Sequence, residues 1–207
     1  DGDSRIGVDA DTLTLSGVLS GDALTKSGSG ALVLSTATSE IDGLSITGGT
    51  VTLADGADVT LATSLYVGRY SGQNGALVVA DGTRIVISEV DGVLFYIGTS
   101  GTGKITQTGG TVEQNDRGAM YIGNNGAYDI SGGTFDQGSL SIGTGAGTGS
   151  VVQTGGDVYA RRDIRMGRYG GTGIYTISGG TLTVNNSSGR DNGYLVVGRD
   201  TEGSSAT

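Results

Sequence analysis

The chain has 207 residues and a net charge of −9, and 42 residues are Gly, roughly a fifth against about 7% in average proteins. It has no Pro, Cys, His or Trp. Without Cys and His there are no disulfides, thiolate nucleophiles or Ser-His-Asp triads, and the usual ligands of zinc, copper and haem are missing. An acidic chain is also a poor partner for nucleic acid, because that affinity rests on neutralising phosphates.

The first 60 residues hold nine acids and two bases, while the other 147 hold twelve acids and ten bases. The excess of acids in the first 60 residues suggests one ligand only, Ca²⁺. Its binding would be adventitious, because the sequence contains no complete calcium-binding motif. We expect no membrane insertion by this segment, because no apolar run approaches the ~18–20 residues of a membrane helix.

Residues 12–53 contain short alternating stretches of apolar and polar residues separated by Gly. They read Leu13-Thr-Leu15-Ser16-Gly17-Val18-Leu19-Ser20-Gly21, Leu24-Thr-Lys26-Ser-Gly28-Ser-Gly30-Ala-Leu32-Val-Leu34 and Gly43-Leu-Ser-Ile46-Thr-Gly48-Gly49-Thr50-Val51. This stretch resembles the autotransporter passenger-associated β-strand repeat. The resemblance implies a right-handed parallel β-helix and export to the surface of a bacterium, and it implies no catalytic chemistry.

Residues 61–207 alternate between two motifs. In the first, a Gly precedes Gly-Gly by six residues, as in Gly103-Lys-Ile-Thr-Gln-Thr-Gly-Gly110; a variant has Asp81-Gly82 after Gly75, and a final repeat starts at Gly203. The leading Gly residues are Gly75, Gly103, Gly126, Gly149, Gly173 and Gly203, spaced by 28, 23, 23, 24 and 30. The second motif is apolar-x-apolar-Gly, as in Phe95-Tyr-Ile-Gly98 and Met120-Tyr-Ile-Gly123. Both are short, alternate with period two and are bounded by Gly, which is typical of β-strands.

This regular recurrence predicts an all-β, right-handed parallel β-helix (a β-solenoid) of about seven or eight coils, each of roughly 23–30 residues, the handedness coming from the resemblance. A β-sandwich would give no reason for such regular spacing. We expect one continuous solenoid over residues 1–207, with acidic coils over 1–60 and repeat coils over 61–207, and expect it to be part of a longer chain. Gly is expected at the corners because it tolerates positive φ angles.

A coil register sorts residues into columns that face outward or inward. The middle residues of apolar-x-apolar-Gly form one outward column: Tyr66, Tyr96, Tyr121, Ser141, Arg165 and Val196. Its tyrosines and Arg165 are a candidate face for a glycan or a partner, although an aromatic ladder that only stiffens the sheet is the commoner arrangement. Gln107 and Gln153 fall in an apolar column and should hydrogen-bond to corner backbone.

Two sets of charged residues are further candidates. Glu113 and Asp136 are expected side by side in adjacent coils, close enough for the carboxylate pair of a retaining glycosidase, although solvated or ion-paired acids are commoner on solenoids. Arg161, Arg162, Arg165 and Arg168 form a basic cluster in the sequence and are candidate charges for assembly.

The sequence leaves three functional hypotheses open. The first is an extracellular structural solenoid, without enzymatic activity, that builds a surface filament, fibre or stalk by stacking head to tail with copies of itself. The second is an autotransporter-type passenger whose tyrosine face binds a host surface or a glycan. The third is a carbohydrate-active β-helix enzyme that uses carboxylates. We favour the first, because no cap protects either end of the predicted stack.

Overall fold

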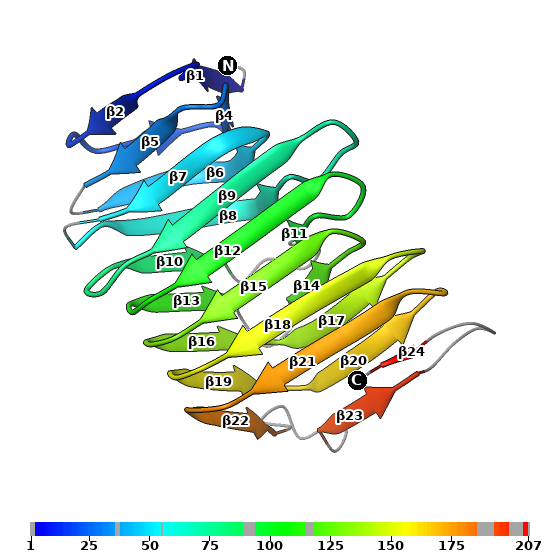
Figure 1. Ribbon diagram of the computed structural model, residues 1–207. Coiled ribbons are helices and arrows are strands. Elements are labelled where there is room, and N and C mark those ends of the chain that lie inside the picture. Colours follow the sequence, from blue (N-terminus) through cyan, green and yellow to red (C-terminus); the bar gives the residue numbers. More distant parts are fainter. Residues whose placement is uncertain are drawn as a thin grey trace.

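The computed structural model describes residues 3–35, 38–54, 56–88, 94–114, 118–185, 193–198 and 205–206. It confirms the all-β solenoid: the strands stack along one axis (Figure 1), every pairing between them is parallel, and the described residues contain no helix. Because each strand pairs with its equivalents in the coils before and after it, the ladders run continuously along the axis.

Each complete coil has three sides. The first side, face 1, is a nine-stranded sheet: β2 (Thr12–Leu15), β5 (Ala31–Leu34), β7 (Gly48–Leu53), β9 (Asn74–Val79), β12 (Thr102–Gln107), β15 (Gly126–Ile130), β18 (Thr148–Gln153), β21 (Thr172–Ile177) and β24 (Ser205–Ala206). Successive members lie one coil apart. Nine strands are separated by eight steps of one coil each, which agrees with the seven or eight coils that the sequence predicts.

The other two sides belong to one 15-stranded sheet. Face 2 comprises β3 (Ser20–Gly21), β10 (Arg84–Ile87), β13 (Thr111–Gln114), β16 (Thr134–Gln137), β19 (Asp157–Ala160) and β22 (Thr181–Val184). Face 3 comprises β1 (Ser4–Gly7), β4 (Leu24–Ser27), β11 (Leu94–Ile97), β14 (Ala119–Ile122), β17 (Ser139–Thr144), β20 (Asp163–Arg168) and β23 (Tyr194–Val197). Two long strands, β6 (Ser39–Ile46) and β8 (Asp58–Val67), run across both faces and join them.

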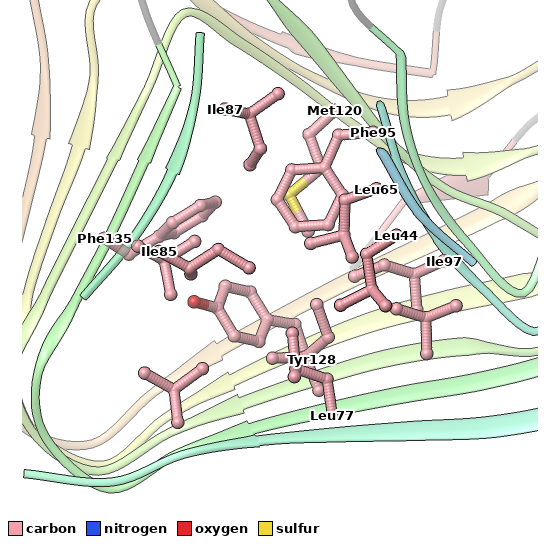
Figure 2. Close-up of a cluster of buried hydrophobic side chains, with 14 of the residues drawn as sticks. Leu44, Leu65, Leu77, Ile85, Ile87, Phe95, Ile97, Met120, Tyr128 and Phe135 are labelled. Carbon is pink, nitrogen blue, oxygen red and sulfur yellow. The ribbon is translucent and has the colours of Figure 1, made fainter. Parts of the chain in front are cut away.

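Alternate residues of all three faces meet in one apolar core (Figure 2). Leu77 from face 1, Ile85 from face 2 and Phe95 from face 3 all have no exposed surface. Each such side chain contributes about 1.5–3 kcal/mol by burial, which must offset a backbone entropy cost of about 1–2 kcal/mol per ordered residue. A single coil therefore needs its neighbours in order to fold.

The glycines of the repeat have two different structural roles, of which the sequence predicted one. The last residue of Gly-Gly has a positive φ, 65° at Gly110, as expected of a corner. The leading Gly is required for another reason. A Cβ on Gly103 would lie 2.1 Å from the carbonyl oxygen of Val67, so any side chain there would collide with the backbone of the previous coil.

Candidate functional site

The outward tyrosine column has the register that the sequence predicts. Tyr96 pairs with Tyr66 on one side and with Tyr121 on the other, on β8, β11 and β14. The ring centroids of Tyr66 and Tyr96 are 5.9 Å apart, and those of Tyr96 and Tyr121 are 5.0 Å apart with nearly parallel planes. Partial burial and the neighbouring Tyr121 raise the pKa of Tyr96. The three rings thus form a half-buried ladder along face 3.

An arginine that the sequence analysis did not single out completes this ladder. The guanidinium carbon of Arg69 lies 4.3 Å from the ring centroid of Tyr66, 4.6 Å from that of Tyr96 and 4.9 Å from that of Tyr70. Cation–π contacts of this kind hold a guanidinium in place without neutralising it. Arg69 stands in the corner after β8, where the only sequence signal was its place between Gly68 and Tyr70.

The same column continues with Ser141 and Arg165, in register with Tyr121. Ser141 occupies the outward position of the column but is only 3% exposed. Arg165 is partly exposed, and its Nε lies 2.5 Å from Oδ2 of Asp163. Arg165 therefore belongs to the outer face of the column, one coil beyond the serine.

The four arginines of the predicted basic cluster lie at successive points of one coil: Arg161 and Arg162 stand between β19 and β20, and Arg165 and Arg168 lie on β20. Arg161 is bonded to Asp136 and Arg165 to Asp163, so both are already used in ion pairs within the chain. Arg168, at the end of β20, lies 4.7 Å from the ring of Tyr169. Arg162 is exposed. A role for these charges in assembly stays a prediction, and the ion pairs weaken it.

Glu113 and Asp136 lie in adjacent coils in register, as predicted. Each carboxylate is held by an arginine: Arg84 donates to Glu113 at 3.1 Å, and Nε of Arg161 donates to Asp136 at 2.6 Å. Arg84 also lies 3.6 Å from Asp58, and Arg161 lies 3.9 Å from Glu113. The five residues form a chain of ion pairs along face 2, which is the arrangement typical of a structural network.

Gln107 and Gln153 face the core and are fully buried, which confirms their predicted role. The side-chain nitrogen of Gln107 donates to the carbonyl oxygens of Gly110 at 3.2 Å and Thr134 at 3.0 Å, and that of Gln153 donates to Gly156 at 3.0 Å and Thr181 at 2.8 Å. Each glutamine thus ties the corner of its own coil to the strand of the next.

The oxygen of each glutamine accepts a hydrogen bond from a tyrosine of the next coil, which the sequence analysis did not foresee. The hydroxyl of Tyr128 donates to Gln107 at 2.5 Å, and that of Tyr175 donates to Gln153 at 2.7 Å. Burial raises the pKa of both tyrosines above the ordinary value. The two Gln–Tyr pairs have the same geometry two coils apart, so they are part of the repeat and do not form a single site.

Lys26 is the unexpected charged residue of the core. It has no exposed surface, and its Nζ donates to the carbonyl oxygens of Ser27 and Gly28 at 2.9 Å each and of Gly48 at 3.0 Å. Desolvation lowers the pKa of Lys26, while Asp9 acts in the opposite direction. The ammonium group thus joins two successive corners at the N-terminal end of the solenoid.

Within the described ranges, no group of three or more acidic side chains is placed to hold a metal ion, and no helix is long and apolar enough to cross a membrane. Comparison with protein-family models, curated proteins and solved structures found no match to this chain. The resemblance to passenger-associated repeats therefore rests only on the residues quoted above for residues 12–53.

Proposed function

We propose that this chain is a structural segment of an extracellular surface fibre or stalk, in which solenoids stack end to end with other copies. One observation carries the proposal: core columns that are buried along the solenoid become exposed in the outermost described coils. Leu195 and Val197 on β23 are 59% and 58% exposed, whereas their partners in the preceding coil, Ile164 and Met166, are 0% and 5% exposed.

The other end has the same character. Leu13 on β2 is 39% exposed, whereas its partner Leu32 in the next coil is fully buried. Among the described residues, β2 and β23 each pair with a strand on one side only, and a strand edge of this kind readily accepts a further strand. A heterologous contact between two different ends of the same molecule repeats without closing and so produces a fibre.

The side faces support a scaffold more than an enzyme. The candidate carboxylates Glu113 and Asp136 are held in ion pairs, and the buried polar groups Gln107, Gln153 and Lys26 bond to corner backbone. Bacterial surface export is part of the proposal because the N-terminal coils resemble passenger repeats.

Sedimentation velocity over a range of protein concentrations tests end-to-end stacking. We expect the wild-type chain to form species that lengthen with concentration, and the double substitution Leu195→Asp/Val197→Asp to stop this growth by placing charges on the exposed core columns. Val152→Asp is the matched control, because Val152 is an outward valine in the middle of face 1, on β18. A wild-type chain that stays monomeric at hundreds of micromolar contradicts the proposal; equal loss in the control would indicate lateral association instead.

A further inference from the structure

The three-residue sequence Gly-Arg-Tyr occurs twice where face 3 turns into face 1, directly after β8 (Gly68-Arg69-Tyr70) and across the end of β20 (Gly167-Arg168-Tyr169). In both copies the arginine lies over the ring of the following tyrosine, at 4.9 Å for Arg69 and 4.7 Å for Arg168. Tyr70 and Tyr169 are 56% and 58% exposed. Each corner therefore presents an exposed aromatic ring with a cation against it.

The two corners lie on one edge of the molecule, the edge formed by the turns between face 3 and face 1 (Figure 1). Register from β8 through β11, β14 and β17 to β20 places them four coils apart, which corresponds to about 19 Å at ~4.8 Å per coil. Between them, face 3 carries the ladder of Tyr66, Tyr96 and Tyr121 and then Arg165. We call this set of five tyrosines and three arginines the corner strip.

The charge of the corner strip is opposite to that of the chain as a whole. Across residues 64–67 of β8, the later face 3 strands β11 to β20 and the corners that follow each of them, the only carboxylate is Asp163, which is 7% exposed and bonded to Arg165. The whole chain has 21 acidic and 12 basic side chains. On face 2, Arg84 and Arg161 are paired with acids, whereas Arg69 lies among aromatic rings.

From this geometry we infer that the corner strip binds an acidic polysaccharide, a chain of carboxylate-bearing sugars laid along the solenoid axis. Aromatic rings offer flat apolar surface to the C–H faces of sugar rings, and the rigid guanidinium fork matches a carboxylate. Cation–π contacts already hold Arg69 and Arg168, and an ion pair holds Arg165, so little side-chain freedom remains to be lost on binding. This inference does not depend on fibre formation, because the strip lies on the side of the solenoid.

The spacing and number of charges favour a polysaccharide over nucleic acid. Duplex DNA carries one charge per ~1.7 Å and is bound by dense basic surfaces, which a chain of net charge −9 with three arginines over about 19 Å does not provide. A carboxylated glycan carries at most about one charge per sugar. Its uncharged ring faces lie between these charges, as the tyrosine ladder lies between the arginines of the strip.

Isothermal titration of the full chain with polygalacturonate tests the inference, with fully methyl-esterified polygalacturonate as the uncharged counterpart. We expect binding that weakens as salt is raised, and at least tenfold weaker binding of the ester. The double substitution Arg69→Gln/Tyr70→Ala should weaken binding at least tenfold. Lys104→Gln, which removes an exposed base of face 1, should leave it unchanged. Thermal unfolding of each variant shows whether it has kept its fold.

Two further comparisons complete the test: oligogalacturonides of different length, and a single-stranded oligonucleotide as a different polyanion. Because the two corners lie about 19 Å apart, an oligogalacturonide that spans both should bind more tightly than a disaccharide, and Tyr169→Ala should remove that advantage. No binding of polygalacturonate at millimolar sugar, equal binding of the ester, or an equal loss in Lys104→Gln would each overturn the inference. Tighter binding of a single-stranded oligonucleotide than of the glycan would assign the strip to nucleic acid and overturn it too.

Discussion

The hydroxyl of Tyr128 donates a hydrogen bond to the side-chain oxygen of Gln107 in the preceding coil, and both side chains are fully buried. Tyr128 also packs edge-on against Phe135, with ring centroids 4.7 Å apart (Figure 2 shows both rings inside the core). The pair therefore joins two successive coils from within the core.

Tyr128→Phe should lower the free energy of unfolding by about 1–3 kcal/mol, because it leaves the oxygen of Gln107 buried without a donor. Tyr175→Phe removes the equivalent bond to Gln153 near the end of the stack, where Tyr175 is only partly buried, and should cost less. Urea unfolding of both variants measures the difference. Equal and negligible costs would show that water replaces both bonds.

Stability should fall as the pH rises above about 10. A tyrosine in the unfolded chain loses its proton near pH 10, whereas burial raises the folded-state pKa of Tyr128 and Tyr175. Above pH 10 the folded state thus binds more protons than the unfolded state, so each tyrosine lowers stability by up to about 1.4 kcal/mol per pH unit. Urea unfolding from pH 8 to 11.5 should show a shallower decline in Tyr128→Phe than in the wild type.

Lys26 contributes to the same profile with the opposite sign. Its folded-state pKa is lowered, so the folded state releases the proton first and stability rises as the pH passes from that pKa to the unfolded value near 10.4. Comparing Tyr128→Phe with the wild type cancels this contribution, because both chains retain Lys26. An unchanged slope in Tyr128→Phe would show that Tyr128 does not hold its proton in the folded state.

Lys26→Met should damage the N-terminal coils selectively. The substitution fills the space but leaves the corner carbonyls of Ser27, Gly28 and Gly48 without their shared donor. In a solenoid each coil contacts only its neighbours, so the loss should stay local. Hydrogen exchange should become faster in β4 to β7 and remain unchanged in β15 to β18. Uniformly faster exchange would instead indicate that the solenoid unfolds as a single unit.

The leading glycines should tolerate no side chain. Gly103→Ala places a Cβ against the backbone of Val67 and should cost about 3 kcal/mol or prevent folding. Gly17→Ala is the control, since a Cβ there meets nothing within 4 Å and φ is not in the left-handed region; we expect no loss and up to about 1 kcal/mol of gain. Thermal unfolding of both variants measures these changes in stability. A Gly103→Ala variant as stable as the wild type would contradict the close approach of Gly103 to the backbone of Val67.

The carboxylates of face 2 should prove structural. We expect no release of reducing ends from polygalacturonate or other glycans by the wild-type chain, and only a small stability loss, about 1 kcal/mol for each partly exposed ion pair, in Glu113→Gln/Asp136→Asn. A reducing-end assay measures cleavage directly. Hydrolysis by the wild type that disappears in the double variant would establish the enzyme hypothesis in place of the scaffold.

Periodicity predicted most of the fold because a solenoid repeats its register from coil to coil. The outward column through Tyr96, the inward glutamines and the adjacency of Glu113 and Asp136 all follow from the spacing of Gly residues. Periodicity says nothing about what breaks the repeat. The buried Lys26 contradicts the usual exposure of lysine, and its need for three corner carbonyls became apparent only from the path of the backbone.

The contacts that long side chains make in the corners could not be predicted from the sequence either. Arg69 lies outside the alternating strands, so no column predicted that it would lie against Tyr66 and Tyr96. Similarly, Arg161 returns one coil to bond Asp136, which turned an apparent cluster of bases into part of an ion-pair network. In both cases the rotamer of one flexible side chain decides the contact, and spacing alone does not determine it.

Negative-stain electron microscopy of the purified chain at high concentration tests the proposed end-to-end stacking most directly. The account predicts unbranched polar fibres whose axial repeat is about 43 Å per copy, because the nine face 1 strands from β2 to β24 rise ~4.8 Å each. The fibres should disappear in Leu195→Asp/Val197→Asp and persist in Val152→Asp. Isolated short rods for the wild-type chain at every concentration would contradict the account.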